Sequence, residues 1–98
     1  MNENNEKELN IVCLYLINNQ IIIGNSVDND MAVQLEKPYI LNINHEGKLE
    51  FIPYLNEFTG EDNFIFNSLS VMNVFKPYAK YISKYIEIYN MENQQQLL

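Results

Sequence analysis

The stretch Gly24-Asn25-Ser26-Val27-Asp28-Asn29-Asp30-Met31-Ala32-Val33-Gln34-Leu35 decides the fold class of this 98-residue chain. It consists of the end of one strand, a short acidic turn and the start of another strand. Apolar residues alternate with polar or small ones from Met31 to Leu35, which is typical of a strand with one buried face. Gly24 has no side chain and so allows a bulge or a sharp bend. The stretch predicts a β-hairpin whose acidic turn is either a chemical site or a structural joint.

Other short apolar segments, rich in β-branched and aromatic residues, predict further strands on both sides of this hairpin. Asn18-Asn19 predicts a two-residue turn, because Asn tolerates a positive φ. Pro38 predicts a bulge or bend in the strand that follows Leu35, because proline cannot donate to a strand ladder. Five bent strands or six straight ones over residues 9–75 predict a mostly-β fold, a small and strongly bent barrel. The remaining segments are 11–17, 20–23, 39–43, 49–55, 64–66 and 71–75.

The hydrophobic periodicity changes from that of strands to that of a helix after Lys76-Pro77. Proline is favoured in the first turn of a helix, so Pro77 is consistent with a helix start. Tyrosines and isoleucines then recur at spacings of three and four, which forms one apolar stripe. This pattern predicts an amphipathic helix within residues 76–91 that packs against the barrel or a neighbouring subunit. The polar segments 1–8 and 92–98 are expected to be flexible tails. The stripe comprises Tyr78, Tyr81, Ile82, Tyr85, Ile86 and Tyr89.

The chain carries 13 Asp and Glu residues against six Lys and no Arg, for a net charge of −7 at pH 7. This charge repels a nucleic-acid backbone at long range. The first ten residues lack the pattern of a secretory signal, and no apolar run approaches the roughly 18 residues that span a membrane. The single Cys13 cannot form an intrachain disulfide and has the context of a buried apolar residue. We therefore expect a cytoplasmic protein without a membrane partner.

The order and spacing of these segments resemble the Sm and Sm-like (LSm) family, which includes bacterial Hfq and small Sm-like proteins of phages. The first family motif closes a strand on Gly and continues as Asp-x-aromatic-Met-Asn-hydrophobic-x-hydrophobic. Gly24 and the segment from Asp28 to Leu35 are similar to it. The second motif, with a central Arg-Gly, is similar to Ile65-Phe66-Asn67-Ser68-Leu69-Ser70-Val71-Met72.

The resemblance implies a strongly bent five-stranded, SH3-like sheet whose edge strands pair with those of neighbouring subunits. Such pairing gives a closed homo-oligomeric ring of five to seven subunits. Gly24 and Asp28 would then be structural, with Asp28 accepting backbone N–H groups to brace its loop. One departure concerns the helix, which precedes the first strand in this family and here follows the last.

The resemblance also places an RNA site at Asp30, Met31, Ala32, Asn67 and Ser68. In RNA-binding members, a base stacks on the aromatic residue before Met, is hydrogen-bonded by the next Asn and is held by the Arg of the second motif. Asp30, Ala32 and Asn67 stand at these three positions. An acid cannot stack a base, Ala has no polar group, and Asn lacks a planar cation. We expect the usual uridine pocket to be lost.

Three lysines spaced four apart, Lys76, Lys80 and Lys84, form a second candidate site. They could contact phosphates around a ring, where one copy of the strip per subunit would add avidity. The alternative interpretation is a solvated helix face on which Lys84 pairs with Glu87. The tyrosines of the helix likewise either stack on bases or pack against the sheet.

The remaining polar clusters predict neither catalysis nor metal binding. Asp28, Asp30 and Glu36 lack the ligand series and central Gly of a calcium loop. His45 has no nucleophile or orienting partner in a recognisable motif. The carboxylates of the 56–62 loop, Glu57, Glu61 and Asp62, are typical of a solvated loop. We therefore expect no catalytic residues, no metal and no cofactor.

Taken together, the sequence predicts a non-enzymatic, ring-forming binding or scaffold protein with an unknown protein partner and without the usual RNA pocket. One alternative is weak RNA binding through the lysines or another face of the ring. Another is a monomeric SH3-like barrel that binds a partner peptide.

Overall fold

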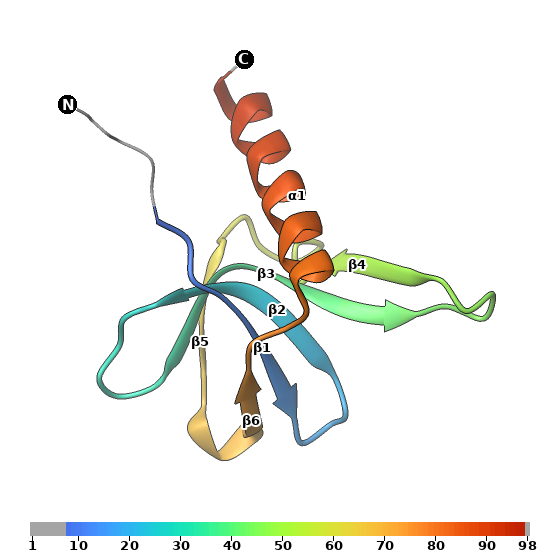
Figure 1. Ribbon diagram of the computed structural model, residues 1–98. Coiled ribbons are helices and arrows are strands. Elements are labelled where there is room, and N and C mark those ends of the chain that lie inside the picture. The colour runs from blue at the N-terminus through green and yellow to red at the C-terminus, as the bar shows by residue number, and fades with distance from the viewer. Residues whose placement is uncertain (1–7, 98) are drawn as a thin grey trace.

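Six antiparallel strands and one C-terminal helix make up residues 8–97, the part of the chain that the computed structural model describes (Figure 1). A 3₁₀ turn, η1, joins the last two strands. The mostly-β class and the C-terminal helix predicted from the sequence are confirmed. The elements are β1 (Ile11–Leu16), β2 (Ile21–Val27), β3 (Val33–Ile43), β4 (Leu49–Pro53), β5 (Asn63–Phe66), η1 (Ser68–Ser70), β6 (Val71–Phe75) and α1 (Ala79–Leu97).

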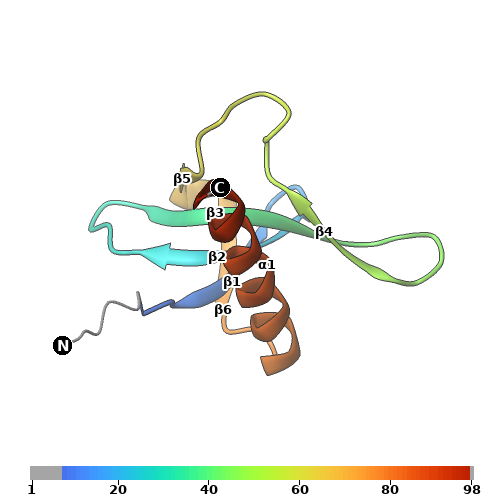
Figure 2. The same cartoon turned by 90° about the horizontal axis from the view of Figure 1, so that it is seen from above.

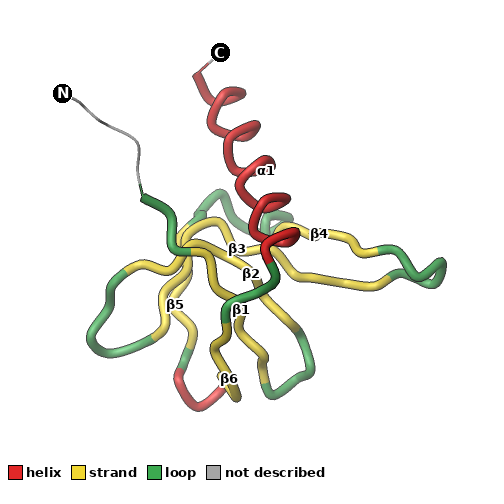
Figure 3. Tube along the Cα trace, viewed as in Figure 1, coloured by secondary structure: helices red, strands yellow, loops and turns green. Residues whose placement is uncertain are grey.

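The sheet does not close on itself, so the predicted barrel is an open, bent sheet. Its strand order is β4-β3-β2-β1-β6, and β5 also pairs with β3. The first half of β3 pairs with β5 and the second half with β4, both on the edge opposite β2. Within residues 8–97, β4, β5 and β6 therefore each have one edge without a strand partner (Figure 3).

Both faces of the central strands are buried. Cys13 and Ile23 are paired across β1 and β2 and belong to the cluster that α1 covers. Leu14 and Ile22, the next pair, lie on the opposite face, in the cluster that β3 and β5 complete with Leu35 and other residues. Seen from above, α1 is over the central strands (Figure 2), and its C-terminal part rises away from the sheet (Figure 1). Burial on two faces explains why β1 and β2 are continuous apolar runs.

The turn between β1 and β2 is one residue longer than predicted. The N–H of Leu16 donates to the carbonyl of Gln20 at 2.9 Å, which encloses a loop of Ile17, Asn18 and Asn19. Asn19 has φ of 70°, the positive value expected for an asparagine in this turn. A three-residue loop with its last residue in the left-handed region is a common hairpin connection.

Pro38 marks a change of strand partner inside β3, not a break in the strand. Lys37, just before it, has φ of 49°, and neither residue is paired in a strand ladder. The backbone N–H of Lys37 donates instead to the carbonyl of Asp62, beyond the ladder. The predicted bend therefore lies where β5 ends its pairing and β4 begins.

Gly24 lies at a bulge between β2 and β3, where the register shifts between Ile23 and Asn25. A Cβ at Gly24 would lie 3.1 Å from both Cβ and Cδ1 of Leu35, and 3.3 Å from the carbonyl oxygen of Glu36. The sequence prediction of a bulge here is confirmed. Its physical reason is the close approach of β3.

The helix begins and ends later than predicted from the sequence. Lys76, Pro77 and Tyr78 form a link before α1, and the N–H groups of Tyr81 and Ile82 donate to the Tyr78 carbonyl at 3.0 and 3.2 Å. At the other end α1 continues to Leu97, so residues 92–97 are helical where a tail was predicted. Most of the predicted N-terminal tail, residues 1–7, lies outside the described residues, as does Leu98.

Two tyrosines of α1 attach the helix to the sheet through polar contacts. Tyr85 is fully buried, and its hydroxyl donates toward the carbonyl oxygens of Glu36 and Lys37, at 2.8 and 2.9 Å. The Tyr89 hydroxyl donates to Glu36 Oε1 at 3.2 Å, and the Lys37 ammonium lies 5.0 Å from the centre of the Tyr89 ring. The predicted packing of the tyrosine stripe against the sheet is confirmed for these two residues.

Candidate binding surfaces

The positions at which the sequence resemblance predicts an RNA site lie at one end of the β3–β5 ladder. Val33 of β3 pairs with Phe66 of β5. Ala32 directly precedes Val33, and Asn67 directly follows Phe66. Because the two strands are antiparallel, Ala32 and Asn67 lie at the same end of this ladder. The loop with Asp30 and Met31 and the turn with Asn67 and Ser68 therefore leave the sheet at the same end.

The side chains at this end are exposed or engaged in local turn contacts. Asp30 is exposed, and Met31 is 89% exposed. The Asn67 side chain is used locally, since its Oδ1 accepts from the N–H of Leu69 at 2.9 Å and caps η1. Asp30, Ala32 and Asn67, the residues at these positions, carry no cation.

The brace of the acidic turn is Asn29, one residue after the predicted Asp28. Asn29 Oδ1 accepts from the N–H of Met31 at 2.9 Å, and its Nδ2 donates to Gln34 Oε1 at 3.0 Å. This is the local turn chemistry of asparagine. Asp28 is exposed and lines a shallow hollow together with Glu8 and Lys76.

The three candidate lysines are exposed but do not form a uniform strip. Lys76 lies in the link before α1, while Lys80 and Lys84 lie on α1. The Lys80 ammonium is 5.2 Å from the centre of the Tyr81 ring. Lys84 pairs with Glu87 at 3.2 Å, as the solvated-face interpretation predicts.

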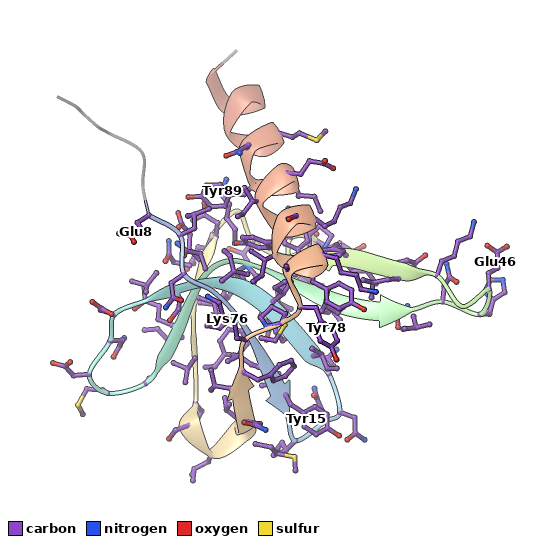
Figure 4. All side chains as sticks on the ribbon, viewed as in Figure 1. Glu8, Tyr15, Glu46, Lys76, Tyr78 and Tyr89 are labelled. Carbon is purple, nitrogen blue, oxygen red and sulfur yellow. The ribbon has the colours of Figure 1, made fainter. Side chains whose placement is uncertain are left out.

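The predicted acidic and histidine candidates remain apart from one another. Glu36 Oε1 accepts from Asn25 Nδ2 at 2.9 Å and from Tyr89, so this carboxylate is turned into the structure, away from exposed Asp28 and Asp30. His45 is exposed in the turn of the β3–β4 hairpin, and its neighbour in sequence, Glu46, lies at the tip of that hairpin (Figure 4). Among the described residues, no three His, Cys, Asp or Glu side chains gather closely enough to hold a metal ion.

The loop before β5 keeps its acidic residues at the surface. Glu57, Glu61 and Asp62 are exposed. The last two line a hollow of about 270 Å³ with Lys37, and Thr59 Oγ1 accepts from the Glu61 N–H at 3.1 Å. The arrangement is that of a loop folded against β3.

Sequence reasoning missed a buried polar link at the bulge. The N–H of Asn10 donates to Asn25 Oδ1 at 2.7 Å, and Asn25 in turn donates to Glu36. Asn25 is 3% exposed. The signal in the sequence is an Asn directly after Gly24 in an otherwise apolar strand, since a buried amide needs partners.

Cys13 is a buried residue of the core, as the sequence predicts. Its side chain is 1% exposed, and burial raises the pKa of the thiol to about 11. The nucleophile in cysteine chemistry is the thiolate, which such a pKa suppresses at neutral pH. Cys13 thus behaves as a small apolar group.

The segment β5–η1–β6 carries a series of exposed apolar side chains next to the unpaired strand edges. Leu69 of η1 is 84% exposed, and Ile65 and Met72 are each more than half exposed. Val74 of β6 is also exposed. Exposed apolar residues beside open edges are typical of surfaces that pair with another chain.

Within residues 8–97, no helix combines the length and the apolar character that a membrane crossing requires. The chain matches neither a model of a known protein family nor a curated protein sequence.

Proposed function

We propose that this chain is a non-catalytic binding and scaffold protein that assembles into a closed homo-oligomeric ring by pairing of its strand edges. The observation that carries the proposal is the open sheet. The unpaired edge of β5 lies at one side of the sheet and the unpaired edge of β6 at the other. Two different edges pair head to tail, and head-to-tail pairing generates a ring when the rotation closes.

The exposed apolar residues support the same arrangement. Met72 and Ile65 are 61% and 65% exposed in the single subunit. Pairing β6 of one subunit with β5 of the next would cover part of both side chains. The Sm family implies five to seven subunits and the same kind of edge pairing. In such a ring the altered RNA-pocket positions at Asp30, Ala32 and Asn67 would be repeated once per subunit.

The oligomeric state tests the proposal. Size-exclusion chromatography with light scattering at micromolar concentration is expected to give one species of five to seven times 11.6 kDa. A charge on an edge opposes pairing with another strand. Met72→Lys and Ile65→Lys are therefore each expected to weaken assembly at least tenfold, with unchanged circular dichroism. Met91→Lys, an exposed position in the second half of α1, is the matched control and should assemble normally. A monomeric wild-type protein would favour the SH3-like, peptide-binding alternative.

RNA titration separates the scaffold role from the RNA-binding alternative. We expect no saturable binding of U-rich or A-rich RNA at low or moderate salt, because no ring or cation stands where the family holds its base. Fluorescence anisotropy with labelled oligonucleotides measures this directly. Saturable binding that disappears in the double variant Lys80→Glu, Lys84→Glu would instead assign an RNA site to α1.

A further inference from the structure

An apolar groove of about 490 Å³ lies where the link from β6 to α1 crosses the sheet. Its floor is formed by Cys13, Ile21 and Leu41, one residue from each of three neighbouring strands. Phe75 and Tyr81 stand at its sides. The volume falls within the range of about 300 to 1,000 Å³ that small-molecule sites occupy.

The floor of the groove is buried at Cys13 and partly buried at Ile21 and Leu41, and the mouth is exposed. Cys13 is 1% exposed and its thiol is neutral, so the floor is apolar throughout. At the mouth, Ile43 is 66% exposed and Tyr78 is 77% exposed. An apolar ligand entering here would remove both side chains from water.

The lining of the groove carries positive charge only, although Lys76 also borders the neighbouring hollow that Glu8 and Asp28 line. No Asp or Glu lines it, although the chain has 13 of them, and the single charged residue in its lining is Lys76. Lys76 makes no ion pair with a carboxylate of residues 8–91. A second cation, Lys80, lies over the ring of Tyr81, which itself lines the groove. Lys76 and Tyr78 both lie at the foot of α1 (Figure 4).

We infer that this groove binds an aliphatic carboxylic acid with a medium or long chain. The chain lies on the floor formed by Cys13, Ile21 and Leu41. The carboxylate lies at the mouth, beside the Lys76 ammonium, and the nearby Lys80 ammonium over the Tyr81 ring further offsets the repulsion from this acidic protein. Charge complementarity selects the head group, and burial of the chain supplies the affinity.

Calorimetric titration of the full chain with dodecanoate, below the concentration at which it forms micelles, tests the inference. We expect saturable binding at one site per chain. Each methylene that leaves water adds about fourfold in affinity, so octanoate, decanoate and dodecanoate, which differ by two methylenes per step, should differ by about fifteenfold per step. Dodecyltrimethylammonium, which has the same tail and the opposite charge, should bind at least tenfold more weakly than dodecanoate.

Two variants locate the site. Lys76→Glu should weaken dodecanoate binding at least tenfold and strengthen binding of the cationic amphiphile. Lys84→Glu is the matched control, because Lys84 is paired with Glu87 and does not line the groove. Circular dichroism establishes that both variants are folded. Absence of saturable dodecanoate binding to the folded protein overturns the inference. So does binding that Lys76→Glu leaves unchanged, or equal binding of the two amphiphiles.

Discussion

Replacing Tyr85 with alanine is expected to lower the free energy of unfolding by about 4 kcal/mol, a loss typical of a buried aromatic side chain. Tyr85 is fully buried among residues of β1, β2 and β3, and its ring packs edge-on against Tyr39 with centroids 6.0 Å apart. Since domains of this size are stable by only about 5 to 15 kcal/mol, this single change removes a large part of the total.

The conservative variant Tyr85→Phe isolates the hydroxyl group. It keeps the ring but removes the donor that reaches the carbonyl oxygens of Glu36 and Lys37. Leaving a buried acceptor unsatisfied costs about 1 to 3 kcal/mol. Because burial raises the pKa of this hydroxyl far above its ordinary value, it remains a donor at every pH at which the protein is handled.

Urea unfolding followed by circular dichroism measures both changes. Tyr78→Ala and Tyr78→Phe serve as controls, because Tyr78 is 77% exposed. We expect both control variants to stay within about 0.5 kcal/mol of the wild type, as exposed substitutions usually do. If Tyr85→Phe were as stable as the wild type, the hydroxyl would not hold α1 to β3 as described.

Gly24→Ala is expected to destabilise the protein by about 1 to 3 kcal/mol through overpacking. The new methyl group would meet Leu35 Cβ and the Glu36 carbonyl oxygen, which are fixed to the backbone of β3 and cannot turn aside. To make room, β2 and β3 must separate at the bulge. That movement also strains the hydrogen bond from Asn25 to Glu36 that lies beside it.

Thermal unfolding with Gly60→Ala as the matched control tests this expectation. A Cβ at Gly60 would have no atom within 4 Å, and this glycine is exposed. An alanine there should be neutral or slightly stabilising, because it restricts the unfolded chain. Equal melting temperatures of the Gly24→Ala and Gly60→Ala proteins would contradict the close packing of β3 on β2.

The strands could be predicted from the sequence because their signal is local. Apolar runs bounded by Asn, Gly and Pro gave all six strands to within a few residues, and the Gly24 bulge followed from a single missing side chain. The openness of the sheet could not be predicted in this way. It depends on whether β5 and β6 pair with each other, and nothing within either short strand specifies its partner.

The predicted start and end of the helix were wrong for two different physical reasons. Pro77 was expected inside the first turn, but it is buried beside the sheet and the helix begins after Tyr78, whose carbonyl accepts the first helical bonds. At the other end, the helix was expected to stop by residue 91. The Glu and Gln residues that follow are good helix formers, so α1 continues through them.

The candidate RNA site of the sequence analysis stays a prediction, although Ala32 and Asn67, which the motif spacing put in one site, do flank the same end of the β3–β5 ladder. The apolar groove was invisible in the sequence, because its floor takes one residue from each of three strands and its rim takes Lys76 from a link that was expected to be helical. Such a surface exists only once the tertiary structure has formed.

The pairing of β6 with β1 has a consequence for the order in which this protein folds. The strands β1 to β4 form a meander in which each strand pairs with the next one in the sequence, so each pairing closes only a short loop. The pairing of Cys13 with Phe75 instead encloses most of the chain, and the entropy of closing so long a loop must be offset by contacts already made. The meander is therefore expected to form first, with β6 and then α1 added last. During synthesis on a ribosome, one edge of β1 therefore stays without a strand partner until β6 has been made.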